Sequence, residues 1–219
     1  MYLTIGNIPK SLRRKPSQRA CILIAYLPIE SQLKGVGVSE TERKNRTHRL
    51  FHEAMRLVLE PLIEAGKNGM EMTGANGEVR WVHPLLACYV ADFPEQCLMT
   101  CTKYGTCPKC RKGSNDLQGP EPGERRTWDW TLNIIESAKK SSSKTAFYQS
   151  CMENDVSGSV YTPFWKGFPY CDIHMATTPD VLHQLYQGVL KHLIGWVQTL
   201  MTEEEFDMRL RTLPPAFGV

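Results

Sequence analysis

The stretch YVADFPEQCLMTCTKYGTCPKCRK, residues 89–112, contains the most distinctive residues of the chain. An apolar run ends there in a single acid, Asp92, and four cysteines follow, the last two as Cys107-Pro-Lys-Cys110. Apolar runs of this length are typical of buried strands, and α/β folds tend to place ligands at the carboxyl ends of their strands. Residues 85–92 are therefore predicted to form a strand that delivers Asp92 to a sheet edge, followed by a cysteine-containing insertion.

The segments before this stretch predict two strands and a helix. Residues 20–29, ACILIAYLPI, form a continuous apolar run that is typical of a strand buried on both faces, and residues 1–8 are predicted to be its neighbour. Residues 39–65 have apolar side chains at helical spacing and open with a pattern that resembles a capping box. Gly66 is the expected stop signal for this helix.

The later segments predict further helices. Residues 128–155 are expected to be helical in pieces, interrupted by the tract KKSSSK, and residues 179–201 carry the clearest amphipathic pattern. The order strand, strand, helix, strand, insertion and helix predicts an α/β or α+β fold. We expect a core over 1–95, a cysteine-containing insertion of loops and short helices over 96–175, and a helical part over 176–219.

Composition places the chain among ordinary globular proteins. The 219 residues are 42% hydrophobic and 22% charged, and no apolar run approaches the ~20 residues of a membrane span. The N-terminal residues lack the pattern of a signal peptide. The eight cysteines are therefore expected to be reduced thiols or metal ligands rather than disulfides.

Positive charge is concentrated near the N-terminus. Residues 1–50 hold ten Lys or Arg against three Glu, while the whole chain has a net charge of +3. A basic group lies in the predicted turn between the first two strands and suits contact with DNA phosphates, although a solvated surface is an equal alternative. Its members are Lys10, Arg13, Arg14, Lys15 and Arg19. Aromatic residues do not alternate with these cations, so base stacking on single strands is not indicated.

The CPKC sequence has the spacing of a zinc-ligand pair. Two thiolates at this spacing can reach one Zn²⁺ at ~2.3 Å each, and the ion then needs two more ligands. One source is the pair Cys171 and His174; the other is the C-terminal helix, with His183 and His192. Nine residues separate the two helical histidines, which places them about 180° apart on a straight helix. His183 is therefore the preferred helical ligand, with Cys171 or His174 completing the set.

Other interpretations of the cysteines remain open. They could be buried free thiols beside a core histidine. A redox dithiol is less favoured, because a loop rather than a helix is predicted to follow Cys110. Cys97 and Cys101 are four residues apart and fit one buried helix face, while Cys21 and Cys88 lie in apolar strands and are expected in the core.

Asp180 has a simple structural interpretation. It precedes the apolar helix, where an acid favours the helix dipole, and shares a face with His183 and Gln184. We expect this group to cap and anchor the helix, with contact to the catalytic edge as the alternative.

Five blocks of the sequence, in order, resemble a known family. The blocks are YLTIGNIPKSLRRKPSQRACILIAYLP, HPLLACYVADFPEQ, CPKC, TPDVLHQLYQGVLKHLIGW and RLRTLPP. In these blocks the chain is similar to fungal Plavaka-type DNA transposases, which belong near the CACTA and Kyakuja–Dileera–Zisupton elements.

This resemblance implies an RNase H-like core with a mixed sheet, here partial, and three acids that bind two divalent ions, Mg²⁺ or Mn²⁺. Asp92 matches the second acid of the family. The first acid is expected before the YLTIGN block and the last, a Glu, beyond RLRTLPP, so the resemblance predicts a transposase fragment that is inactive by itself. Glu95 and Glu203–Glu205 are disfavoured as substitutes.

The implied partners are transposon ends and target DNA, with no membrane, and the expected location is the nucleus or otherwise the cytoplasm. The insertion is expected to carry a structural Zn²⁺. Homo-oligomer formation is left open. The competing hypothesis is a non-enzymatic protein that binds zinc and nucleic acid through the same cysteines and the same basic group. A thiol oxidoreductase is the third.

Overall fold

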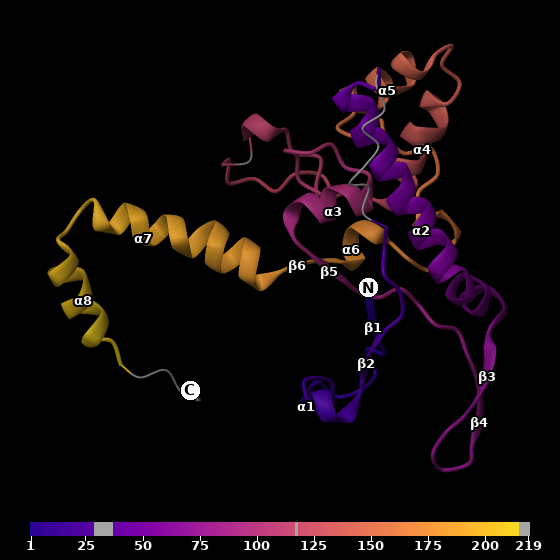
Figure 1. Cartoon of the computed structure of the whole chain (residues 1–219), viewed down its shortest axis with the longest axis horizontal. Coiled ribbons are helices and arrows are strands. Elements are labelled where there is room, and N and C mark those ends of the chain that lie inside the picture. The colour runs from indigo at the N-terminus through magenta and orange to yellow at the C-terminus, as the bar shows by residue number, and fades with distance from the viewer. Residues whose placement is uncertain (29–36, 117, 215–219) are drawn as a thin grey trace. The chain divides into compact units, whose positions relative to one another are not determined.

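The structure is a computed structural model that describes residues 1–28, 37–116 and 118–214 (Figure 1). The chain contains both helices and short strands, which confirms the mixed α and β class. The chain divides into two compact units. The larger unit contains Met1–Tyr89 and Pro94–Thr178, and the smaller unit contains Val90–Phe93 and Pro179–Val219. The division expected at residues 95 and 175 remains a prediction. Among the described helices, none has the length and apolarity needed to cross a membrane.

The first two strands pair as expected, but they are not buried. β1 (Tyr2–Thr4) and β2 (Cys21–Leu23) are antiparallel, with Leu3 opposite Ile22. The expectation of burial on both faces is wrong, because Cys21 is exposed and Ile22 is 62% exposed. A two-stranded ribbon covers little of its own surface, whatever the apolarity of its residues. Position 29 of the predicted strand lies outside the described residues.

The longest helix, α2, runs over Glu40–Asn68. Its start follows the prediction, since the Ser39 hydroxyl accepts a hydrogen bond from the Glu42 amide at 3.2 Å. The predicted end of the helix is wrong, because α2 continues past Gly66 to Asn68. Its C-cap is Gly69, which has φ 72°. A Cβ on Gly66 would lie 3.0 Å from both the Pro169 ring and the Pro84 carbonyl oxygen. The absence of a side chain at Gly66 therefore serves close packing rather than helix termination.

The remaining strands form two more two-stranded sheets. β3 (Met70–Thr73) and β4 (Val79–Val82) make an antiparallel hairpin directly after α2 (Figure 1). β5 is only Tyr89–Ala91, shorter than the predicted 85–92, and pairs with β6 (Thr177–Pro179). Cys88 is exposed rather than in the core. Because the described strands pair only in twos, the RNase H-like sheet remains a proposal.

Short helices make up most of the remaining larger unit. The helical pieces predicted around the KKSSSK tract are found as two helices, α4 (Trp128–Ala138) and α5 (Lys144–Glu153). The other elements are α1 (Lys10–Arg13), η1 (Pro16–Gln18), α3 (Phe93–Thr100), η2 (Ser114–Asp116), η3 (Phe164–Gly167) and α6 (Ile173–Ala176).

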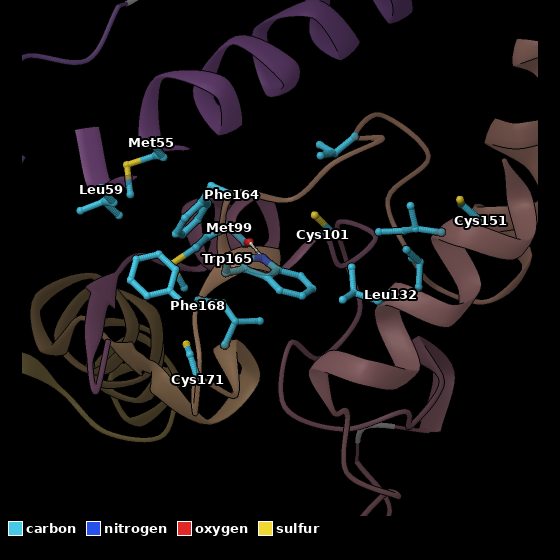
Figure 2. Close-up of a cluster of buried hydrophobic side chains, with 14 of the residues drawn as sticks. Met55, Leu59, Met99, Cys101, Leu132, Cys151, Phe164, Trp165, Phe168 and Cys171 are labelled. Carbon is cyan, nitrogen blue, oxygen red and sulfur yellow. Dashed lines mark hydrogen bonds between the residues drawn. The ribbon is translucent and has the colours of Figure 1, made fainter. Parts of the chain in front are cut away.

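One cluster of buried side chains joins these elements of the larger unit (Figure 2). Met55 and Leu59 reach it from α2, and Phe164 and Trp165 reach it from η3. The Trp165 indole nitrogen donates a hydrogen bond to the Met99 carbonyl at 2.8 Å, so this large side chain is buried without an unpaired polar atom. As expected, Cys97 and Cys101 are also buried.

His52 is a polar residue inside this cluster and is only 1% exposed. Its Nδ1 accepts a hydrogen bond from the Phe164 amide at 3.2 Å, and its Nε2 donates to the Leu98 carbonyl at 3.0 Å. Burial lowers the pKa of His52 to about 4. The imidazole is therefore neutral in the folded protein. Its two hydrogen bonds join α2 to Leu98 and to Phe164.

The smaller unit contains the predicted C-terminal helix. It begins as a π-helix, η4 (Val181–Leu190), continues as α7 (Lys191–Gln198) and is followed by α8 (Glu203–Arg211). The predicted apolar stripe lies on this helix, but its side chains are exposed within the described residues.

We expect acid to destabilise the fold through its buried histidines. Unfolded His52 takes up a proton near pH 6.5, whereas folded His52 resists protonation until about pH 4, so stability present above pH 6.5 is lost as the pH falls toward 4. Because each pKa unit is worth about 1.4 kcal/mol, this one buried group would cost on the order of 3 kcal/mol. Urea unfolding between pH 7.5 and 4.5 measures the loss.

The variant His52→Gln should be less stable at neutral pH but show a flatter pH dependence. The exposed His192→Gln is the matched control and should keep the wild-type profile. An unchanged slope in His52→Gln would contradict this assignment.

Candidate functional site

The CPKC turn lies in the larger unit with both thiols half-buried. The Lys109 amide donates to Cys107 Sγ at 3.3 Å, across the turn. After the turn, Cys110 forms a β-bridge with Arg125, so the segment that follows is extended rather than helical. The helix N-terminus that activates dithiols of the thioredoxin type is therefore replaced by a loop, as the sequence predicted.

Arg126 is a buried side chain that donates hydrogen bonds to the backbone of this turn. Its Nε donates to the Cys107 carbonyl at 2.8 Å and to the Cys110 carbonyl at 3.0 Å, so one side chain joins both ends of CPKC. Arg126 is 1% exposed. The sequence analysis missed this residue, because an arginine in the loop tract GERRT carries no local signal that it will be buried.

The outer nitrogens of Arg126 are buried without a hydrogen-bond partner in the part of the chain that the structure describes. Its Cζ lies 5.4 Å from the centre of the Trp130 ring, and Arg111 Cζ lies 5.0 Å from the same ring. Burial lowers the pKa of Arg126, while the charges of Asp155, Cys107 and Cys110 act in the opposite direction.

Two further side chains fix the turn to the fold. Lys109 Nζ donates to the carbonyls of His174 at 2.6 Å and Met175 at 3.3 Å, and to that of Thr177. The His174 Nδ1 donates to the Pro108 carbonyl at 2.8 Å.

His174 is thus next to the turn, but both of its ring nitrogens are occupied. The second, Nε2, accepts from the Thr131 hydroxyl at 2.8 Å. Burial lowers the pKa of His174 to about 4, so it is a neutral imidazole between CPKC and α4. In this geometry it orients the turn and offers no free nitrogen to a metal.

The other predicted ligands are not gathered around CPKC. Cys171 is buried, and burial raises the pKa of its thiol to about 11. His183 belongs to the smaller unit, where it is exposed and its Nδ1 contacts the Asp180 carboxylate. Across residues 1–28, 37–116 and 118–214, no three His, Cys, Asp or Glu side chains are placed to hold one metal ion.

Cys107 and Cys110 place two thiols on one turn, the spacing from which the sequence predicts a zinc-ligand pair. Their ligation of zinc remains a prediction, as does the identity of the other two ligands.

Asp92 follows β5 directly and precedes α3. It is half-buried. Within the smaller unit, the Asp180 amide donates to the Ala91 carbonyl at 3.0 Å, so Asp180 lies beside the residue that precedes Asp92. The position fits a strand-end metal ligand and also fits an N-cap of α3.

Asp180 caps η4, as expected from the sequence. Its Oδ1 accepts from the Leu182 amide at 3.2 Å, and its Oδ2 accepts from the His183 amide at 3.1 Å. These bonds satisfy donors of the first turn that have no partner inside the helix.

The basic turn forms two short helical turns rather than a hairpin loop, because α1 and η1 fill most of residues 10–18. Arg13 is half-buried, and its Nε donates to the Ile8 carbonyl at 2.8 Å. The other four cations, Lys10, Arg14, Lys15 and Arg19, are exposed. In the described residues none of the five forms an ion pair, which leaves their charge available to a phosphate backbone.

A comparison with protein families agrees with these features. The family model described as Plavaka transposase matches residues 1–197 of the 219. The chain belongs to the Plavaka transposase family. No curated protein and no solved structure matches it. The Plavaka match includes Asp92, the basic turn, CPKC and the Asp180–His183 pair, and it ends before α8.

Proposed function

We propose that this chain is part of a DDE/DDD-type transposase with an RNase H-like core, and that Asp92 supplies one of its catalytic carboxylates. The observation that supports this most directly is the position of Asp92 at the end of β5 in a Plavaka transposase. A carboxylate at a strand end is positioned by the sheet, and its oxygens are suitable ligands for a hard cation. When bound, Mg²⁺ or Mn²⁺ would stabilise charge on the attacking and leaving oxygens of a phosphodiester.

The proposal includes inactivity of the chain by itself. Two-metal chemistry needs several carboxylates converging on one phosphate. The described residues bring Asp92 and Asp180 to neighbouring positions, but Asp180 uses its carboxylate oxygens on the first turn of η4 and on His183. DNA cleavage and strand transfer would therefore need further carboxylates beside Asp92 to complete the site.

The basic turn would contact DNA phosphates. Its exposed cations lie within ten residues and have no acidic neighbours in ion-pair range among the described residues. Contacts of this kind position a protein on DNA and carry no sequence information. Recognition of transposon ends is therefore not assigned to this turn.

A structural Zn²⁺ would be held in part by Cys107 and Cys110. The side chains of Arg126, Lys109 and His174 attach the turn to the fold through hydrogen bonds to carbonyl oxygens. None of these three bonds uses a sulfur atom, so both sulfurs could serve as metal ligands. The same residues would serve a non-enzymatic protein that binds zinc and nucleic acid, which is the second candidate function.

The nuclease prediction concerns Asp92→Asn. With Mg²⁺ or Mn²⁺ and double-stranded DNA, we expect the purified chain to cleave no faster than Asp92→Asn, because one strand-end carboxylate cannot hold two ions. The measurement is the appearance of nicked plasmid over time, with the exposed Asp207→Asn as control. Cleavage that Asp92→Asn abolishes and Asp207→Asn retains would show a complete active site and overturn the proposed inactivity.

The DNA-binding prediction concerns charge placement. Replacing the four exposed cations of the turn by Gln should weaken DNA binding and reduce the salt dependence of log K by roughly 0.9 for each phosphate that the turn no longer neutralises. Binding is measured by fluorescence anisotropy at salt concentrations of about 50 to 200 mM. The control removes the same number of charges from ion-paired arginines: Arg46, Arg56, Arg80 and Arg209. Equal weakening in both variants would mean that only net charge matters, against a specific role for the turn.

A further inference from the structure

Lys109, one of the two residues between the cysteines, uses its whole ammonium group on one distant segment of the chain. Its Nζ donates to the carbonyls of His174 at 2.6 Å and Met175 at 3.3 Å, and to that of Thr177. An ammonium group has three hydrogens to donate, so these contacts use all of them. The half-buried Lys109 is therefore bound to protein carbonyls rather than available to DNA phosphates.

The three carbonyls lie at the junction between α6 and β6. The helix ends at Ala176 and the strand begins at Thr177, so no loop separates the two elements. The last carbonyls of a helix have no amide partner inside it, and a lysine at that end satisfies them. Thr177 is 1% exposed, and its hydroxyl donates to the Ile173 carbonyl at 2.7 Å. The start of β6 is thus fixed inside the larger unit.

The strand pair that begins at this junction leads to the two acids discussed above. β6 pairs with β5, and each strand has only three residues. Asp92 follows β5 directly and Asp180 follows β6, and the Asp180 amide donates to the Ala91 carbonyl at 3.0 Å. An isolated pair of such short strands has little stability of its own. The placement of the acids therefore depends on contacts made from outside the pair.

We propose that Lys109 is a positioning residue: its three carbonyl contacts fix the start of β6 and thereby hold the β5–β6 pair that leads to Asp92. This inference rests on the proposed function for the role of Asp92, but it requires no metal at the CPKC turn. It gives that turn a task in the folded chain, which is to attach the insertion to the strand pair.

A side chain can position a distant segment only if its own backbone is held in place. The turn that carries Lys109 meets this condition. The Arg126 Nε donates to the carbonyls of Cys107 and Cys110, and the His174 Nδ1 donates to the Pro108 carbonyl at 2.8 Å. Contacts therefore run in both directions between the turn and α6.

Lys112 provides a matched comparison three positions further along the chain. It is also half-buried, and its Nζ also donates to carbonyls, those of Gly119 at 3.2 Å and of Glu121. These partners are 7 and 9 positions away, whereas the partners of Lys109 are 65 to 68 positions away. Loss of an ammonium and of its carbonyl contacts is common to both residues, but only Lys109 reaches β6.

The experiment measures hydrogen–deuterium exchange of the full chain by NMR, with the Asp180 amide as the main probe. Lys109→Met removes the ammonium but keeps a long unbranched side chain. We expect the Asp180 amide and those of β5 and β6 to exchange on the order of tenfold faster, because bonds from a charged donor are lost at Thr177. Lys109→Arg keeps charged donors and should exchange more slowly than Lys109→Met. Lys112→Met should stay within about threefold of wild type.

Amides elsewhere in the larger unit separate positioning from general support of the fold. A residue that only stabilises the whole unit would speed exchange throughout it when replaced. We expect instead that the amides of α2 and of the β3–β4 hairpin keep their wild-type rates in Lys109→Met. If Lys109→Met does not fold by circular dichroism, Lys109→Gln, which retains an amide donor, replaces it.

The inference and the proposed function fail separately. Wild-type exchange of the Asp180 amide in the folded Met or Gln variant, equal acceleration in Lys112→Met, or no recovery in Lys109→Arg would overturn the role of Lys109. These measurements contain neither metal nor DNA, so they leave the role of Asp92 as it stands. Mg²⁺-dependent cleavage that survives Asp92→Asn would instead remove the catalytic role of Asp92 and leave the effect of Lys109 on exchange in place.

Discussion

The hydrogen bonds from the Arg126 Nε to the carbonyls of Cys107 and Cys110 are the contact on which the candidate metal centre depends. They join the two ends of the turn through its backbone carbonyls, so the Nε of Arg126 is used on the backbone rather than on the sulfur atoms. Pro108 and Lys109, the two residues between the cysteines, are used as well: the Pro108 carbonyl accepts from His174, and the Lys109 ammonium reaches three carbonyls around α6. A four-residue turn is thereby attached to distant parts of the larger unit before any ion is considered.

That attachment follows from the rule that buried polar groups need partners. His52 and His174 obey it as neutral imidazoles, each with one nitrogen donating and the other accepting. Arg126 obeys it only in part, since its Nε is satisfied and its outer nitrogens have no partner among the described residues. Its guanidinium lies instead over Trp130, with Cζ 5.4 Å from the centre of the ring.

The proposed catalytic residue stands in a different setting. Asp92 lies in the smaller unit, in the segment Val90–Phe93, and the hydrogen bond from Asp180 to Ala91 makes Asp180 its neighbour. Among the described residues, Asp92 is not part of the buried cluster. Membership of the Plavaka transposase family gives this acid its proposed role, and the local geometry is compatible with it. The cysteine pair proposed for zinc and the basic turn proposed for DNA contact belong to the larger unit, so binding and chemistry are proposed for separate parts of the chain.

Local signals in the sequence were enough to predict several elements. The start of α2 at Ser39, the interruption between α4 and α5, and the cap of η4 by Asp180 were predictable because each depends on neighbours within about four residues. The pairing of β1 with β2 was also predictable, but the exposure of their side chains was not, since burial depends on what else packs there. The continuation of α2 through Gly66 required the distant Pro169 and Pro84.

The family, the cysteine pair and the basic turn could all be recognised in the amino-acid sequence, because these consist of residue types at fixed short spacings. The folded chain was needed to learn that His174 orients the turn instead of offering a free nitrogen, and that Arg126 lies buried against both cysteines. The physical reason is that hydrogen-bond partners of a buried group are chosen in space. Here the hydrogen-bond partners are 16 to 66 positions apart in the chain, so no local sequence pattern predicts these contacts.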